Sequence, residues 1–256
     1  MSGKRRWGKK KMQYRIFLYL VVYLCLIVFA PTVSGSNNNE GSLPKPLGKP
    51  LTSEEMAEAI GRIKDSQKNI DAISASVSQT KKNPLLNKEI TTEGTIVLKK
   101  PNLLHWDIAR PERLTTIADG RILWIYHPDS KEAQRFVIAE QLMAKQTMEF
   151  FSSTMNMSVE EMGKKFEIAA YRPDKNLILE MKPKSSITAK YLAAIYVWYK
   201  EDKAVPYKFE VIGKKGSSTV TEFQNIVLNP SVKEDIFRFV VPADVTITNA
   251  DESRGY

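Results

Sequence analysis

Hydrophobic and polar residues alternate with a period of two along most of the chain from Ile73 onward. In the first such segment Ile73, Ala75 and Val77 alternate with serines, as in a strand with one buried side. Similar short segments follow one another, separated by turn residues, and this order predicts antiparallel sheet rather than strands alternating with helices. The predicted strands cover residues 90–99, 103–108, 113–118, 121–127, 133–138, 166–171, 177–182, 191–199, 207–212, 218–228 and 237–240.

Two stretches follow a helical period instead. Residues 52–55 have the pattern of a capping box, and the apolar residues after them predict one amphipathic helix over about 52–71. Residues 139–157, rich in methionine and phenylalanine, predict a helical insertion, and a second capping box at 158–161 starts a short helix. Asp119-Gly120 lies between two alternating segments and is the strongest hairpin signal in the chain.

The chain begins with a pattern typical of export. Its first 15 residues hold seven lysines and arginines and no acid, and residues 16–30 carry no charge. The small residues of 32–36 follow, so residues 1–35 are predicted to be a signal peptide cleaved after Gly35. The alternative is an uncleaved anchor helix. Residues 36–51, rich in asparagine, glycine and proline, predict a flexible linker.

Charge and cysteine usage exclude several classes of function. The net charge of +9 comes mostly from the basic start, because the rest of the chain has 31 basic and 29 acidic residues, which argues against nucleic-acid binding. Cys25 is the only cysteine and lies in the apolar segment, so a domain without that segment has no disulfide and no thiolate. His105 and His127 do not form a metal-binding pattern and are expected to be surface residues. Since no nucleophile–base arrangement is visible, we expect neither an enzyme nor a cofactor.

Several motifs occur in a recognisable order. Residues 100–106 read KPNLLHW, and 110–112 read RPE. The hairpin of residues 118–128 reads ADGRILWIYHP, and residues 223–229 and 237–245 form two closing segments. Together these motifs resemble the LolA-like lipoprotein carriers, over about residues 52–248. The chain departs from the family pattern in having Lys100 where the family usually has arginine, and Leu104 where it has an aromatic residue.

The resemblance implies an unclosed antiparallel β-barrel, mainly β with some α, whose helices cover a hydrophobic cavity for acyl chains. Residues 249–256 would then be a C-terminal tail. Lys100 corresponds to the residue that latches the helical lid. The segments that match the family's cavity strands, together with the methionine-rich insertion, contain these predicted cavity residues: Leu104, Trp106, Ile122, Trp124, Tyr126, Met143, Met148 and Phe150. Each of the strand residues is an equally good core residue.

Partners follow from the same resemblance. The cargo would be the acyl chains of lipoproteins, which a monomeric carrier accepts from an inner-membrane ABC transporter and delivers to an outer-membrane receptor across the periplasm. Two alternatives use the same fold: a periplasmic module that senses lipid and signals, and a carrier of glycolipid or another hydrophobic molecule. A hydrolase with an unfamiliar site is a third, which the missing G-x-S-x-G motif argues against.

Overall fold

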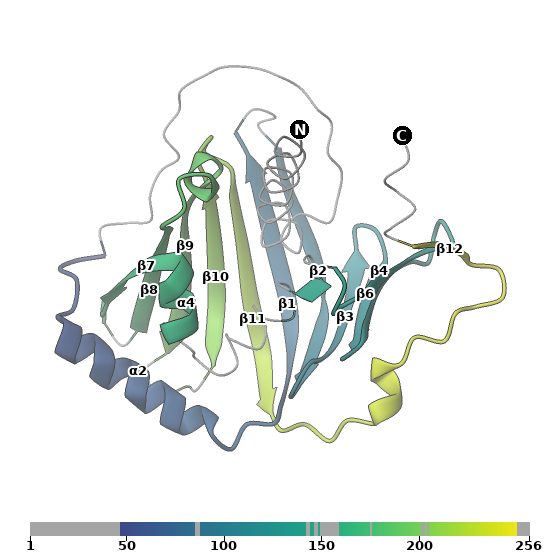
Figure 1. Ribbon diagram of the computed structural model, residues 1–256, viewed down its shortest axis with the longest axis horizontal. Helices are drawn as coiled ribbons and strands as arrows, with labels where there is room; N and C mark the ends of the chain where they lie inside the picture. The colour runs from purple at the N-terminus through teal and green to yellow at the C-terminus, as the bar shows by residue number, and fades with distance from the viewer. Residues whose placement is uncertain are drawn as a thin grey trace, which may run out of the picture. The chain divides into compact units, whose positions relative to one another are not determined.

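The computed structural model describes residues 47–84, 88–141, 144–145, 148, 159–174, 176–200, 203 and 205–249 (Figure 1). The predicted signal peptide and most of the predicted linker lie outside these residues. The described helices are α2 (Ser53–Gln67), α4 (Val159–Lys165) and the 3-10 helices η1 (Thr188–Lys190) and η2 (Glu234–Phe237). No helix in these ranges has the length and apolar character needed to span a bilayer.

Strands make up most of the described structure, as the alternating pattern predicts. They are β1 (Ala72–Asn83), β2 (Lys88–Lys99), β3 (Leu103–Arg110), β4 (Leu114–Asp119), β5 (Ile122–His127), β6 (Glu132–Val137), β7 (Phe166–Tyr171), β8 (Asn176–Pro183), β9 (Leu192–Lys200), β10 (Pro206–Gly213), β11 (Ser218–Leu228) and β12 (Thr246–Asn249). They form one sheet in the order β12-β6-β5-β4-β3-β2-β1-β11-β10-β9-β8-β7. In the described part of the chain its two end strands do not pair, so the predicted unclosed sheet is confirmed.

The chain divides into two compact units that are interleaved in sequence. The first comprises Met1–Gln67, Thr80–Ile90 and Ser153–Thr221, and the second comprises Lys68–Gln79, Thr91–Ser152 and Glu222–Tyr256. The predicted domain limits, 52 and 248, remain a prediction.

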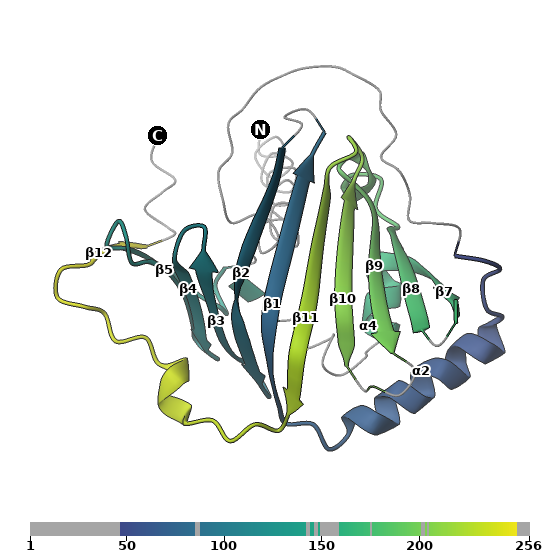
Figure 2. The ribbon, with the colours of Figure 1, turned by 180° about the vertical axis from the view of Figure 1, so that it is seen from behind.

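In the first unit, β7 to β10 pair in antiparallel register and α2 lies across the ends of β8 and β9 (Figures 1 and 2). The capping box predicted for this helix is present: Thr52 N donates to Glu55 Oε2 at 2.8 Å, and Glu55 N donates to Thr52 Oγ1 at 3.3 Å. The helix buries Ala59 and Ile63. On the strands, Leu177, Leu179 and Met181 of β8 are directly opposite Tyr199, Val197 and Ile195 of β9, and all six are buried. The first unit therefore has a continuous apolar side.

The second unit is built on β2 to β6, which also pair in antiparallel register (Figure 2). The predicted hairpin is confirmed between β4 and β5: Gly120 has a φ of +89°, and Asp119 Oδ1 accepts hydrogen bonds from the backbone of Arg121 and Ile122. Asn229 joins the end of β11 to the start of β1. Its Oδ1 accepts from Asp71 N at 2.7 Å, and its own N donates to Ala72 O at 2.8 Å.

One predicted strand is wrong. Residues 237–240 do not pair with a strand, because η2 occupies Glu234–Phe237 and the chain then runs to a turn after Pro242. The apolar residues in this segment pack on a sheet face instead: Phe237 is buried, and the Phe239 ring lies against aromatic rings of β5. The last strand is β12, which pairs parallel to β6 and has no alternating apolar pattern.

Gly94 lies close to the backbone of β3, at the register shift between β2 and β3. A Cβ there would lie 1.9 Å from the Asp107 carbonyl oxygen, so we expect Gly94→Ala to lower the free energy of unfolding by about 3 kcal/mol. Gly61→Ala is the matched control, because a Cβ on this residue of α2 meets nothing within 4 Å and alanine favours helix by about 0.5–1 kcal/mol. Urea unfolding of both variants checks the prediction, which equal stabilities would contradict.

Candidate functional site

The strand register separates the predicted cavity residues into two groups. Residues directly opposite each other on antiparallel strands share one side of the sheet, and successive residues alternate between sides. Leu104 pairs with Ala118, which pairs with Leu123, whereas Trp124 pairs with Ile117, which pairs with His105. Leu104 and Trp106 therefore lie on one side of the sheet, and Ile122, Trp124 and Tyr126 lie on the other. The predicted cavity residues of these strands therefore do not all lie on one side of the sheet.

The first group, Leu104 and Trp106, lies on what we call the apolar side of the second unit. The register places three further buried residues on the same side: Ile96, Leu123 and Ile125. Trp106 Nε1 is buried and has no hydrogen-bond acceptor among the described residues. A buried donor without an acceptor costs about 1–3 kcal/mol, so this indole N–H is an unsatisfied polar group on the apolar side.

Of the three predicted cavity residues in the methionine-rich insertion, only Met148 is among the described residues. Met148 is described and buried, in agreement with an apolar environment. Met143 and Phe150 lie outside the described residues. A small pocket of the first unit, where α2 meets β8 and β9, combines the apolar Ala59 and Ile63 with basic side chains, and no predicted cavity residue lines it.

Two members of the second group, Trp124 and Tyr126, lie against the C-terminal segment 234–239, and we call their side of the sheet the clasped side of the second unit. The Phe239 ring is 5.1 Å from the Trp124 ring and 5.2 Å from the Tyr126 ring, measured between centroids. Lys99 Nζ forms an ion pair with Glu234 at 3.0 Å. Trp124 and Tyr126 are therefore packing partners of segment 234–239 in this structure.

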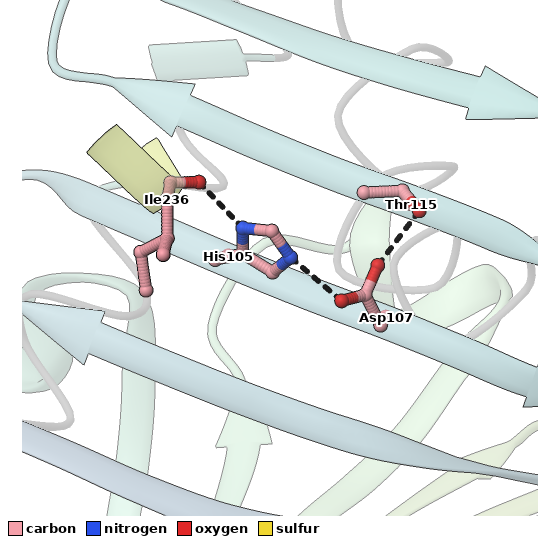
Figure 3. Close-up of polar contacts among 4 residues, drawn as sticks. All are labelled: His105, Asp107, Thr115 and Ile236. Atoms are coloured by element: carbon pink, nitrogen blue, oxygen red, sulfur yellow. Dashed lines mark hydrogen bonds and ion pairs between the residues drawn. The ribbon is translucent and has the colours of Figure 1, made fainter. Parts of the chain in front are cut away.

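His105 fastens the same segment to β3 (Figure 3). Its Nδ1 lies 2.5 Å from the carbonyl oxygen of Ile236, and its Nε2 lies 2.6 Å from Asp107 Oδ2. A carbonyl and a carboxylate accept hydrogen bonds but do not donate them, so both contacts form only when both ring nitrogens carry protons. The geometry therefore favours the imidazolium.

The pKa values move in the directions that this geometry requires. The hydrogen bond to Asp107 raises the pKa of His105 above its usual value, against the opposing effect of burial, and the Ile236 carbonyl raises it further. The hydrogen bond from His105 lowers the pKa of Asp107, and Thr115 adds to this by donating from Oγ1 to Asp107 Oδ1 at 2.7 Å. The expectation of a surface histidine is wrong for His105, whose side chain is largely buried and bonded at both nitrogens.

This network is structural rather than catalytic. The Thr115 hydroxyl contacts the carboxylate and not the imidazole, so the nucleophile–base contact of covalent catalysis is missing from these residues. Within the described ranges, three or more histidine, cysteine, aspartate or glutamate side chains do not gather as a metal site. The sequence did hold one signal for the network: His105 and Asp107, two residues apart on one strand, must share a side of the sheet.

Lys100 follows the end of β2. Its backbone N donates to the carbonyl oxygen of Asp71 at 2.8 Å, and its residue surface is half-buried. The predicted latch depends on the Lys100 ammonium group. Among the described residues, this group has no hydrogen-bond acceptor and no ion-pair partner. Its neighbour Lys99, by contrast, is fixed on the clasped side by Glu234.

Comparison of the chain with known proteins identifies similar sequences. A family model described as "Outer membrane lipoprotein carrier protein LolA" matches residues 68–240. The outer-membrane lipoprotein carrier protein of Shewanella sp. (strain ANA-3) is 24% identical over 195 residues, which cover 75% of this chain and 87% of that protein. Its counterpart in Histophilus somni (strain 2336) is 26% identical over 191 residues, covering 74% and 86%. The crystal structure of a LolA superfamily protein from Nitrosomonas europaea aligns with a TM-score of 0.39 at 13% identity, covering 72% of this chain and 97% of that one.

The described strands form one unclosed sheet, and apolar side chains are buried on one side of it in the second unit. The family match extends over more than half of the chain, and the chain belongs to the LolA family. The family resemblance seen in the sequence is confirmed. Proteins of this family are binding proteins without enzymatic activity, so the chain is not an enzyme.

The contacts of His105 with Ile236 and Asp107, which we call the clasp, predict a pH-dependent stability. An imidazole whose pKa is raised stabilises the folded state below its unfolded pKa of about 6.5, and this stabilisation is lost as pH rises through the folded pKa. The lowered pKa of Asp107 acts oppositely: its contribution is present above about pH 4 and is lost as pH falls through the folded pKa. We therefore expect the clasp to contribute about 1 kcal/mol near pH 6 and less near pH 9, a value reduced by partial solvent exposure.

Urea unfolding of the wild type and of His105→Gln at about pH 6 and about pH 9 measures this contribution. The difference between the two proteins should shrink at the higher pH. His127→Gln, which changes the other histidine outside the network, should leave the pH dependence as it is. A difference that stays constant across this range would show that the imidazolium is not what holds segment 234–239.

Proposed function

We propose that the protein is a periplasmic carrier that binds the acyl chains of lipoproteins and moves them from the inner to the outer membrane. The observation that carries this proposal is the family match over residues 68–240, supported by relatives named as outer-membrane lipoprotein carrier proteins. In this proposal the protein is a monomer, is exported by residues 1–35, and exchanges cargo with an inner-membrane ABC transporter and an outer-membrane receptor.

The apolar side of the second unit is the acyl-chain surface in this proposal. Burying acyl chains gains about 0.8 kcal/mol per methylene, so a carrier needs an extended apolar surface. The apolar side supplies aliphatic and aromatic side chains from several adjacent strands. Its unsatisfied Trp106 N–H is suited to donate to the ester or amide carbonyl at the head of an acyl chain. The clasped side is less suitable, because segment 234–239 already covers Trp124 and Tyr126.

Two tryptophans on opposite sides of the sheet allow a matched test of this surface. Replacing Trp106 or Trp124 with the photoreactive amino acid p-benzoylphenylalanine keeps an aromatic ring at each position. The two proteins are incubated with inner-membrane vesicles that contain lipoproteins labelled in their acyl chains, and are then irradiated. We expect labelled adducts from position 106 and about tenfold fewer from position 124, because only position 106 is on the apolar side.

Adduct formation at neither position, with both proteins folded by circular dichroism, would contradict the carrier function itself. Equal adducts at both positions would preserve the carrier function but overturn the choice of surface. Mass spectrometry of the adducts distinguishes lipoprotein acyl chains from glycolipid or free phospholipid.

We further propose that Lys100 latches the cavity by donating to backbone carbonyls of the covering helices, as the family resemblance implies. A charge-assisted hydrogen bond of about 1.5–3 kcal/mol is strong enough to hold a lid and weak enough to release it. Lys100→Ala should raise the rate at which a hydrophobic dye enters the empty protein by about tenfold, while Lys100→Arg should slow it. Lys99→Ala is the control, because Lys99 pairs with Glu234 on the clasped side. Equal rates of dye entry for Lys100→Ala and Lys99→Ala would contradict the proposed latch.

A further inference from the structure

Two loops of the first unit meet at one end of its strands. The β8–β9 loop, residues 184–191, contains η1, and the β10–β11 turn covers residues 213–217. Lys214 N donates to the carbonyl oxygen of Tyr191 at 2.8 Å, which holds the two loops side by side. We call this end of the unit the basic tip, defined by Lys184, Ile187, Lys190, Tyr191, Lys214 and Lys215.

The conformation of the basic tip is specified locally. Gly213 N donates to Ser217 O at 2.8 Å and closes the turn. In the other loop, Ala189 N donates to Ser185 O at 2.9 Å and Thr188 is buried beneath the surface. The backbone that carries the side chains of the tip is therefore held by hydrogen bonds within each loop.

The composition of the basic tip is unusual for a solvated surface. Ile187 and Tyr191 are 37% and 44% exposed, although both are large and apolar in character. All four lysines are exposed, and neither loop contains an acidic residue to balance them. Two exposed apolar side chains thus lie in the same two loops as four exposed lysines, of which Lys184 donates from Nζ to the carbonyl oxygen of Gly163.

We propose that the basic tip docks on the surface of a membrane that contains anionic lipids. Lysines attract anionic headgroups and keep their ammonium groups in water while their stems lie along apolar surface. Tyrosine favours the headgroup region, and isoleucine reaches the acyl boundary, so this combination fits a membrane surface. An acidic protein partner would neutralise the charge of the tip but would not by itself require two exposed apolar side chains in the same loops.

This docking goes beyond the proposed carrier function, because binding an acyl chain in solution does not require contact with a bilayer. The tip also belongs to the first unit, whereas the proposed acyl-chain surface belongs to the second. Failure of one proposal therefore leaves the other intact.

The test reads the environment of the tip directly in the full chain. In a Cys25→Ser background, Ile187→Cys is labelled with an environment-sensitive nitrobenzoxadiazole dye. Ile247→Cys, at a position 43% exposed in the second unit, is the matched control. Vesicles are made from phosphatidylcholine alone, or from equal parts of phosphatidylcholine and phosphatidylglycerol. We expect the label at 187 to shift to the blue and brighten with the anionic vesicles, while the label at 247 changes little.

The lysines are tested in the same assay. Each lysine near an anionic surface strengthens binding by roughly fivefold, so Lys214→Gln combined with Lys215→Gln should weaken the response at 187 by roughly 25-fold. Lys49→Gln combined with Lys233→Gln, which removes two exposed lysines elsewhere, is the charge-matched control. An unshifted label at 187, equal responses at 187 and 247, or equal losses from the two lysine pairs would each overturn the proposal. An acidic protein partner would give the first of these results.

Discussion

Antiparallel pairing assigns every side chain of β2 to β5 to one of two sides, and the chemistry of the second unit follows this assignment. Ile96, Trp106 and Ile125 fall on one side because their strands pair in a register that brings them into one row with Thr116. A shift of one residue between β2 and β3, or between β3 and β4, would place Trp106 on the opposite side of the sheet from its present partners Ile96 and Thr116. The turns and the bulge at Gly94 are therefore as important to the site as the residues on its surface.

Polar contacts of the second unit are concentrated on the clasped side, where they fix the position of a segment rather than bury apolar area. Hydrogen bonds and ion pairs have directional requirements, so they fix the position of segment 234–239 more narrowly than apolar contact would. His105 and Lys99 hold the start of the segment, and the Phe239 ring lies against the rings of β5. This side is consequently a structural surface, although it contains the tryptophan and tyrosine that the sequence motif emphasises.

Local sequence signals predicted much of the fold, and long-range pairing determined what they missed. The capping box at Thr52 and the Asp119-Gly120 turn are read correctly because each depends on residues within a few positions of one another. That turn also sets the register between β4 and β5. The register between β3 and β4 depends on the connection through Pro111, whose geometry no local rule provides, so the opposite placement of Trp106 and Trp124 was not predictable. Residues 237–240 alternate like a strand, but their partners are rings rather than a neighbouring backbone.

A carrier of the proposed kind places conflicting demands on its apolar residues. Side chains that pack as tightly as a protein core leave no room for cargo, whereas an open apolar surface contributes little to stability until it is filled. The second unit meets this conflict by drawing stability from elsewhere: from the strand ladders, from Asn229 joining β11 to β1, and from the clasp on the opposite side of the sheet. Because the clasp does not involve Leu104 or Trp106, a change in the packing of these two side chains would leave the contacts of segment 234–239 in place.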